Sequence, residues 1–398
     1  MSNQHVPRIA TAVSRRISRE PIRLALVLDE TAVGGVELLM LDVFENFDLR
    51  VVEPRLICLR REGPLAADYR AAGFRVDVIG RSGRYDLRTL TRLVRSLRRE
   101  GIQAVLVTHH HRASLALGRL AARLSGVPVN LVAVHDMDLT RVGKRCLPRW
   151  AVTTLSVSDA LVLLSPSQGE YLHREEQVGR RPWSRTKEVV IPNGVVTKPL
   201  PDSIERAAAR GRLGLNADDF VVGIVARLSA QKAHHVLFKA FAGLLEGHPH
   251  ARLVVVGGGD REMELQMLAR QLGLEGKVLF MGVRRDVPAL LPAFDVSCLS
   301  SVHEGVPMTA IESMAAGIPM VVTDCGALRD MIVDGEQGFI VPVGESSAMA
   351  ERLAALADDS ELRARLGISA RSRVEKMYRI EQTARGYEDL LVSLIGAR

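Results

Sequence analysis

The sequence predicts an α/β protein of two domains, each with a parallel sheet that helices cover on both faces. Short apolar runs alternate with longer segments of helical periodicity, and this alternation occurs in each half of the 398-residue chain. Apolar residues make up 47% of the chain and aromatic residues only 4%. The cores must therefore be mainly aliphatic, as in buried parallel sheets. We expect two Rossmann-like domains that face each other across a cleft.

The apolar runs set the expected strands. In the first half we expect strands at Ile22–Leu28, Leu56–Leu59, Arg75–Ile79, Ala104–Thr108, Val129–Val134, Ala160–Leu164 and Val189–Ile191. In the second half we expect them at Phe220–Ala226, Arg252–Val256, Val278–Met281, Val296–Leu299, Met320–Thr323 and Gly338–Val341. The segment Asp86–Glu100 has helical periodicity, because its apolar residues share one face and its arginines lie off that face.

Breaks in these patterns predict the domain boundaries. A polar, proline-rich stretch follows Ile191-Pro192-Asn193-Gly194, so the first domain should span 21–198 and the second 199–379. Residues 1–20 are polar and arginine-rich, which favours a disordered tail and not a signal peptide. No apolar run is long enough to span a bilayer, and the four cysteines are scattered. These features predict a cytoplasmic protein.

The charge is divided unevenly between the halves. Residues 1–199 hold 31 Lys and Arg against 20 Asp and Glu, a net of +11, whereas residues 200–398 hold 22 against 26, a net of −4. Such asymmetry is typical of proteins that bind nucleic acid or anionic lipid head groups. A solvated arginine-rich surface gives the same count. No aromatic platform or known basic motif supports nucleic-acid binding.

Several polar motifs follow the expected strands of the first half, where ligands bind in open α/β sheets. Gly34-Gly35 leads into a helix, so its backbone can approach a phosphate, although a plain strand-to-helix turn fits too. His109-His110-His111 fits a cleft lining or a polar strand end better than a metal site. His135 ends the next strand and can contact a sugar hydroxyl. Asp136-Met137-Asp138 is too short a pattern to predict a metal site.

The second half offers cations and paired carboxylates. Arg227 ends a strand and Lys232 follows five residues later, a pair that suits a diphosphate leaving group or two ordinary surface positions. Gly257-Gly258-Gly259-Asp260 lacks the dinucleotide fingerprint spacing, which favours a tight turn. Glu304 and Glu312 lie eight residues apart, around a helix start at Pro307. Burying Glu312 is costly without a partner, and a ribose diol is a suitable one.

Together these residues resemble the family-4 glycosyltransferases of the GT-B fold, from about Arg23 to about Leu394. The Glu304-x7-Glu312 spacing with Met314 to Pro319 behind it is the most specific element. Arg227 with Lys232, the Gly34-Gly35 loop and the Ile-Pro-Asn-Gly boundary occur in the same order. The chain departs from the family at Ala226 and Ala327, where the family often has Gly, and at Asp330, where it often has Glu.

The resemblance implies transfer from a nucleotide diphosphate sugar with retention of configuration, no tightly bound cofactor and usually no catalytic metal. It implies that Arg227 and Lys232 hold the diphosphate, with help from amides near Gly35, and that His135 lies near the reaction centre. Glu304 would contact the donor sugar and Glu312 the ribose. The remaining donor-binding residues by resemblance are Val306, Met308 and Thr309. A C-terminal helix, about 380–398, would return to the first domain.

The expected function is that of a glycosyltransferase that uses a UDP-sugar, or a GDP-sugar as the next choice, in bacterial polysaccharide or glycoconjugate assembly. The basic first domain predicts a glycan or polyprenyl-linked acceptor and a peripheral contact with the inner face of the membrane. The local basic cluster is Arg141, Lys144, Arg145 and Arg149. The alternatives are a sugar-nucleotide epimerase, a non-catalytic nucleotide-sugar-binding subunit, a nucleic-acid-binding module and an NAD-dependent dehydrogenase.

Overall fold

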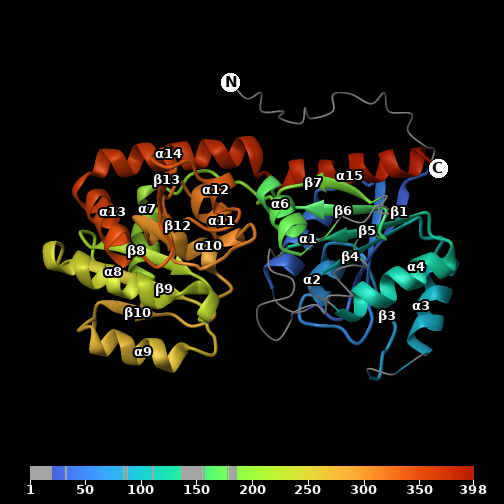
Figure 1. Cartoon of the computed structure of the whole chain (residues 1–398), viewed down its shortest axis with the longest axis horizontal. Coiled ribbons are helices and arrows are strands. Elements are labelled where there is room, and N and C mark those ends of the chain that lie inside the picture. The colour runs from blue at the N-terminus through green and yellow to red at the C-terminus, as the bar shows by residue number, and fades with distance from the viewer. Residues whose placement is uncertain are drawn as a thin grey trace.

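The computed structural model describes residues 20–31, 34–83, 86, 88–109, 112–135, 155, 157–176, 178 and 186–398. Within them, two parallel sheets form two domains side by side (Figure 1). The first has seven strands in the order β3-β2-β1-β4-β5-β6-β7 and the second six in the order β10-β9-β8-β11-β12-β13. The predicted α/β class with two Rossmann-like domains is confirmed.

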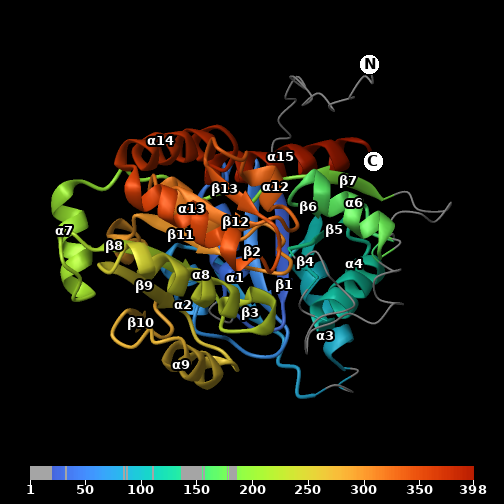
Figure 2. The same cartoon turned by 60° about the vertical axis from the view of Figure 1, so that its left-hand side comes forward.

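The strands of the first sheet are β1 (Ile22–Leu28), β2 (Val52–Cys58), β3 (Arg75–Val78), β4 (Ala104–Thr108), β5 (Val129–Ala133), β6 (Ala160–Leu163) and β7 (Lys187–Val190). Helices α1 (Gly35–Glu45) and α2 (Ala66–Ala71) pack on one face of this sheet. The opposite face carries α3 (Arg88–Arg99), a π-helical turn η1 (Ser114–Gly118), α4 (Arg119–Ser125) and α6 (Pro166–Arg174). Figure 2 shows the same layers from a second direction.

The strands of the second sheet are β8 (Phe220–Val225), β9 (Ala251–Val256), β10 (Val278–Phe280), β11 (Val296–Leu299), β12 (Met320–Thr323) and β13 (Gly338–Val341). The helical elements around it are α7 (Ser203–Arg212), η2 (Ala230–Lys232), α8 (His234–Gly247), α9 (Glu262–Gln271), α10 (Val287–Leu290), η3 (Leu291–Ala293), α11 (Met308–Ala315), α12 (Leu328–Met331), α13 (Ser346–Asp358) and α14 (Ser360–Met377). Every one of the six strands lies where an apolar run predicts it, within one residue at each end.

Two strands of the first sheet begin earlier than predicted: β7 by two residues, at Lys187, and β2 by four. Strand β2 begins at Val52, four residues before the expected Leu56, because Pro54 and Arg55 interrupt the apolar pattern. Pro54 is tolerated because β3 pairs with β2 only from Arg55 onward, so no ladder bond from Pro54 to β3 is lost. The Arg55 side chain is buried, and its guanidinium lies 2.6 Å from Glu100 at the end of α3.

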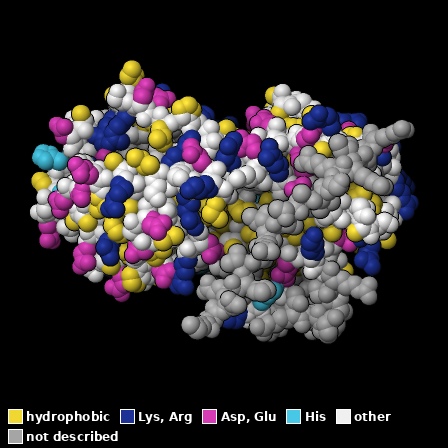
Figure 3. Space-filling model, turned by 90° about the horizontal axis from the view of Figure 1, so that it is seen from above, with side chains coloured by type: hydrophobic (Ala, Val, Ile, Leu, Met, Phe, Trp, Pro, Cys, Tyr) yellow, Lys and Arg dark blue, Asp and Glu magenta, His cyan; other side chains and the backbone are white. Residues whose placement is uncertain are grey.

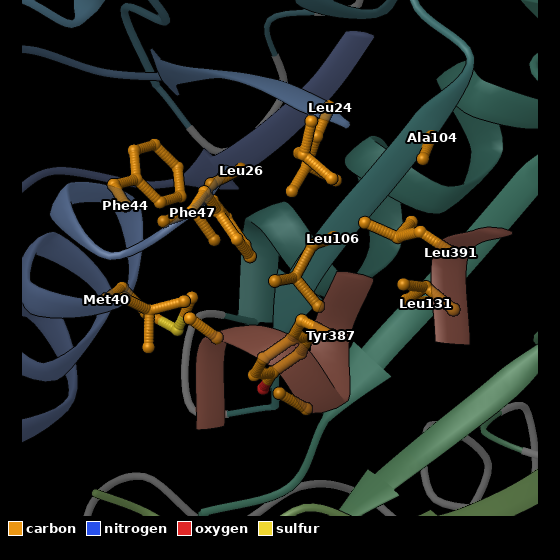
Figure 4. Close-up of a cluster of buried hydrophobic side chains, with 14 of the residues drawn as sticks. Leu24, Leu26, Met40, Phe44, Phe47, Ala104, Leu106, Leu131, Tyr387 and Leu391 are labelled. Carbon is orange, nitrogen blue, oxygen red and sulfur yellow. The ribbon is translucent and has the colours of Figure 1, made fainter. Parts of the chain in front are cut away.

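The last helix, α15 (Ile380–Gly396), belongs spatially to the first domain. It joins the hydrophobic core formed by β1, β4, β5 and α1, and Tyr387 and Leu391 point into that core beside Leu106 and Leu131 (Figure 4). Helices α14 and α15 follow one another along the same side of the molecule (Figure 1). Seen from that side, basic and acidic side chains are interspersed over the second domain (Figure 3).

The chain therefore crosses between the domains twice, and the two crossings pair with each other. The amide of Val195 donates to the Tyr378 carbonyl at 2.9 Å, and the Ile380 amide donates to the Val195 carbonyl at 3.1 Å. Gly194 has no room for a side chain, because a Cβ there would lie 2.6 Å from the Arg379 backbone. The close approach of two backbones thus explains the glycine in this boundary motif.

Two further sequence expectations concern the cysteines and the membrane. Cys58, Cys298 and Cys325 are buried free thiols, and Cys146 lies outside the described residues. Within the described ranges, no helix combines the length and the apolar character that crossing a bilayer requires.

The buried Arg55–Glu100 pair generates a stability prediction. Glu100 accepts hydrogen bonds from Arg55 and Arg99, and these bonds lower its pKa to about 2. Its contribution to stability is therefore complete above the unfolded pKa, near 4.5, and is lost as the pH falls through about 2. Glu100→Gln should lower the free energy of unfolding at pH 7 by about 1.5–3 kcal/mol, because Arg55 keeps a buried charge with a weaker partner.

Urea titration monitored by circular dichroism at pH 7 measures this loss. The exposed Glu246→Gln change serves as the matched control and should leave the midpoint unchanged. Equal stability of Glu100→Gln and the unmodified protein would contradict the assignment of Arg55–Glu100 as a stabilising pair.

Candidate functional site

The topology of each sheet places a candidate site beyond the carboxyl ends of its central strands. The strand order reverses direction between β8 and β11 in the second sheet and between β1 and β4 in the first. Ligands in open α/β folds bind beyond the carboxyl ends of strands at such a reversal. In the second domain the loops at this position are 226–233 after β8 and 300–307 after β11. They carry Arg227, Lys232 and Glu304.

A buried ion pair joins these two loops. Lys232 Nζ lies 2.5 Å from Glu304 Oε1, and the side chains are only 13% and 5% exposed. The Ser301 hydroxyl donates to the same carboxylate oxygen. Charges at low exposure interact more strongly than at a wet surface, so this pair fixes the relative position of both loops. The sequence predicts both residues as site residues, and the structure adds that they contact each other directly.

Backbone and hydroxyl groups hold the ion pair from behind. The Ser300 hydroxyl donates to the Lys232 carbonyl at 2.9 Å, and the Val302 amide donates to the Gln231 carbonyl at 2.9 Å. From β12, the Thr323 hydroxyl donates to the Ser301 carbonyl at 2.6 Å. These bonds orient the carboxylate of Glu304 before any ligand binds, which is the preorganisation that a binding site needs.

The segment after Lys232 is strained. Ala233 has φ of +43° and ψ of +43°, the left-handed conformation that costs a non-glycine residue about 1–2 kcal/mol. Helix α8 begins immediately afterward at His234, whose ring is buried. Burial and, to a smaller extent, the nearby positive charge of Lys232 lower the pKa of His234 to about 4, so the ring is neutral at pH 7. The strained turn thus ends the loop that presents Lys232.

Arg227 lies on the same loop but in a different environment. It is exposed, and in the part of the chain that the structure describes it has no ion-pair partner. Its loop packs closely on the loop after β9, because a Cβ at Gly257 or Gly259 would lie 2.0 or 2.2 Å from the Ala226 or Leu228 carbonyl oxygen. The triple-glycine segment is therefore a tight strand-to-helix turn that supports the Arg227 loop.

Helix α11 begins directly after the Glu304 loop. Pro307 is its N-cap, one residue before the predicted first-turn position, and offers no side-chain hydrogen bond. Within the described residues, no acceptor is bonded to the amides of Met308 and Thr309, whereas the Ala310 amide bonds to the Pro307 carbonyl. An uncapped helix N-terminus is a favourable place for an anionic group.

Glu312 lies in the second turn of α11 and is not stabilised by the described part of the chain. No described residue donates a hydrogen bond to its carboxylate. Burial raises its pKa, and the negative charge of Asp42 in α1 raises it further. Burial, with Glu45 nearby, also raises the pKa of Asp42, to about 6. A carboxylate that is costly to ionise in this way is poised to gain from a hydroxyl donor.

Three contacts bring the first domain to this site. A Cβ at Gly35 would lie 3.7 Å from Met308 Cγ, so the start of α1 meets the start of α11. Asn193 Nδ2 donates to the Val306 carbonyl at 3.4 Å. Asp330 accepts from the Ser167 hydroxyl at 2.6 Å and from its amide at 3.2 Å.

The predicted residues of the first domain are placed as follows. Gly34 is the N-cap of α1, and a Cβ there would lie 2.4 Å from Glu37 Oε2, so the Glu37 carboxylate lies against this turn. His135 follows β5, and its amide donates to His109 Nδ1 at 3.1 Å. The His109 amide in turn donates to the Ala133 carbonyl at 3.1 Å. His109 therefore connects the ends of β4 and β5 and positions the backbone of His135.

Several sequence predictions concern residues outside the described ranges. These are His110, His111, Asp136, Asp138 and the basic cluster Arg141, Lys144, Arg145 and Arg149. Among the described residues, no group of three or more His, Cys, Asp or Glu side chains is arranged to hold a metal ion.

Two family models match this chain over most of its length. Residues 205–373 match the model of glycosyl transferases group 1, and residues 33–198 match that of glycosyltransferase family 4. The chain belongs to the family-4 glycosyltransferases of the GT-B fold. The two loops that carry Lys232 and Glu304 therefore lie in the domain that matches the group 1 model.

Individual proteins that are similar to this chain are also named as glycosyltransferases. The chain is 26% identical over 386 residues to the Escherichia coli UDP-Gal:alpha-D-GlcNAc-diphosphoundecaprenol alpha-1,3-galactosyltransferase, an alignment that covers 94% of this glycosyltransferase and 97% of the relative. EpsD of Bacillus subtilis, named as a glycosyltransferase, is 37% identical over 194 residues, which cover 48% of this chain and 51% of EpsD. Anabaena Alr3699/HepE, solved in complex with UDP and glucose, has the same fold at a TM-score of 0.80 and 20% identity, covering 94% of this chain and 100% of HepE.

The hydroxyl behind Glu304 leads to a prediction about site geometry. In Ser301→Ala, Glu304 keeps Lys232 but loses one of two donors to Oε1, so its carboxylate should rotate away from its oriented position. Turnover should fall by about tenfold, whereas Ser301→Thr, which keeps a hydroxyl, should retain most of it. Initial rates across a range of donor concentrations measure kcat and KM separately for each variant.

A loss confined to protein stability would contradict this positioning role. The buried Ser297 hydroxyl bonds to Ser313 at 2.9 Å within the same domain but away from Glu304. Ser297→Ala is therefore the matched control, and it should change the melting temperature without a comparable change in kcat.

Proposed function

We propose that this glycosyltransferase retains the anomeric configuration of the sugar that it moves from a nucleotide diphosphate sugar to a glycan or a lipid-linked glycan. The observation that carries the proposal is the Lys232–Glu304 pair beside the uncapped start of α11. A UDP-sugar is the favoured donor and a GDP-sugar the alternative. The UDP bound by HepE and the UDP-Gal in the name of the Escherichia coli relative support this order.

The donor diphosphate would bind between cations and helix amides. Arg227 can contact a phosphate without first breaking an ion pair, since it is exposed and has no such partner among the described residues. Lys232 would share its charge between Glu304 and the phosphate. The amides of Met308 and Thr309 add donors, and Gly35 brings the start of α1 to the same place. The buried backbone of Val306 holds the loop in position through Asn193.

Glu312 would accept from the two ribose hydroxyls. Its pKa is raised by burial, so a pair of hydroxyl donors would stabilise the ionised form that the protein alone does not. Glu304 would contact the donor sugar with the carboxylate oxygen that neither Lys232 nor Ser301 engages. His135, held by His109, would approach the sugar from the first domain.

The reaction step that fits these residues is attack from the face that the diphosphate leaves. The acceptor hydroxyl oxygen forms a bond to the anomeric carbon as the bond from that carbon to the phosphate oxygen breaks. The acceptor proton moves to the departing phosphate oxygen. Glu304 is held by two donors on one oxygen, which suits orientation better than nucleophilic attack. Positive charge at Arg227 and Lys232 would stabilise the negative charge that develops on the diphosphate.

The proposal extends to the acceptor and to whether turnover needs a metal ion. We infer a glycan on a polyprenyl diphosphate as the acceptor, from the +11 charge of residues 1–199 and from the diphosphoundecaprenol in the relative's name. The protein would then act at the inner face of the membrane in polysaccharide or glycoconjugate assembly. We also infer that turnover persists in EDTA, since cationic side chains are available for the diphosphate.

Removing the exposed cation should reduce the rate without unfolding the protein. Arg227→Ala loses one contact that stabilises the leaving diphosphate, and such losses lower kcat by about 10²- to 10³-fold. Radiolabelled sugar transfer to a lipid-linked acceptor measures the rate, and the exposed Arg285→Ala change on the same domain is the control. Full activity of Arg227→Ala would contradict its assignment to the diphosphate.

Donor binding itself can be tested by thermal shift with a panel of UDP-, GDP- and ADP-sugars, with and without magnesium. The favoured nucleotide at a hundredfold excess over its Kd should stabilise the fold by about 2.7 kcal/mol, which raises the melting temperature. Glu312→Gln should weaken this rise for the nucleotide sugar, because a neutral amide accepts less strongly from the ribose diol. An undiminished rise would contradict the ribose assignment. In a separate incubation of the donor without acceptor, formation of an epimeric nucleotide sugar would favour an epimerase.

A further inference from the structure

Helices α3 and α4 carry an unusual concentration of positive charge on the first domain. Between residues 88 and 127 the chain has eight arginines, no lysine and a single acidic residue, Glu100. Figures 1 and 2 both show α3 and α4 side by side on the outside of the domain. Arg98 joins them directly, because its guanidinium donates to the Leu124 carbonyl at 2.7 Å.

The arginines of α3 are aligned along one side of the helix. Arg88, Arg92, Arg95 and Arg99 follow the spacing of four, three and four residues that places side chains above one another. Leu93 and Leu97 occupy the opposite side and are buried against the sheet. The positive side chains therefore form one outward-facing ridge instead of surrounding the helix.

Acidic side chains neutralise only part of this charge. Arg92 pairs with Asp86 at 2.6 Å, and Arg99 pairs with Glu100 at 2.9 Å. Glu100 is already shared with Arg55 and Arg75. Among the described residues, Arg88, Arg95 and Arg123 are exposed and have no acidic partner. A surplus of positive charge thus faces solvent on both helices.

Apolar side chains lie beside this charge. Leu120 and Leu124 are one helical turn apart on α4, and they are 46% and 50% exposed. Arg123 lies next to them on the same exposed side. Exposed leucines bordered by arginines are the composition of a surface that lies at a lipid–water interface, where leucine enters the apolar layer and arginine meets the head groups.

We propose that this α3–α4 face, formed by Arg88, Arg95, Arg98 and Arg123 with Leu120 and Leu124, docks the enzyme on an anionic phospholipid surface. Charge complementarity favours phospholipid phosphates, and the two leucines favour a membrane over a nucleic acid. Helices α3 and α4 contain no Phe, Tyr, Trp or His on which a base could stack. The assignment deepens the proposed membrane-held acceptor by naming the surface that would meet the membrane.

Vesicle co-sedimentation of the full chain tests the docking face without donor or acceptor, so its failure leaves the transferase proposal intact. The vesicles contain phosphatidylcholine with or without an equal share of phosphatidylglycerol, at low and at high salt. Binding should require phosphatidylglycerol and should weaken with salt. A variant with Arg88→Gln, Arg95→Gln and Arg123→Gln should bind about a hundredfold more weakly, roughly fivefold for each charge removed.

A matched variant distinguishes binding through the α3–α4 face from binding that depends only on the net charge of the protein. Arg212→Gln, Arg285→Gln and Arg365→Gln remove the same charge from exposed positions of the second domain and should leave partitioning unchanged. Leu120→Ser with Leu124→Ser should reduce binding while the positive charge stays constant. The proposal is overturned if both arginine variants lose binding equally, if the leucine variant binds as the unmodified protein does, or if short single-stranded RNA displaces the protein from vesicles.

Transfer to a water-soluble acceptor analogue provides the second readout. None of the six face residues belongs to the proposed donor site, so the arginine and leucine variants should keep their rate with this analogue. A loss of rate with the soluble analogue would show that the substitutions disturb the fold or the site, and it would overturn the interpretation as a docking surface.

Discussion

The paired crossing of the chain between its two domains is the constraint on which the rest of the structure depends. Val195 exchanges hydrogen bonds with the backbone of Tyr378 and Ile380, and Gly194 allows the two backbones to approach. Two connections restrict the relative motion of the domains more than a single flexible linker would. The loops at the domain boundary can therefore face each other at short distances, as Gly35 and Met308 do.

Electrostatics at the site depend on that proximity. Lys232 and Glu304 belong to one domain, but Asn193, two residues before Val195 in the first crossing, bonds to the loop that follows Glu304. Burial raises the pKa of Glu312 in the second domain, and the negative charge of Asp42 in the first domain raises it further. A nucleotide that places two hydroxyls beside Glu312 would relieve this unfavourable proximity of carboxylates. Donor binding and domain spacing would then be energetically linked.

The alternation of apolar runs with helical segments predicted the fold well, because a strand that is buried on both faces of a parallel sheet has a short, continuous apolar sequence. The strand that differed most from its prediction, β2, contains Arg55, whose charge is balanced by Glu100 at a distance of 45 residues. No local pattern reports such a partner. The site residues were predictable in kind, since Arg227, Lys232, Glu304 and Glu312 carry the chemistry. Their partners were not, because Ser301, Asp42 and Asn193 gain their roles only from contacts that the fold creates.

The position of α15 has a consequence for how the protein is made. Ile380, Tyr387 and Leu391 complete a core whose other members lie mainly between residues 22 and 191. During synthesis the first domain is translated long before these residues, so the part of its sheet that α15 covers stays exposed until residues 380–391 have been produced. Domains made first usually fold first. Here the earlier domain must wait for the later one, which makes chaperone protection of its uncovered apolar face valuable during translation.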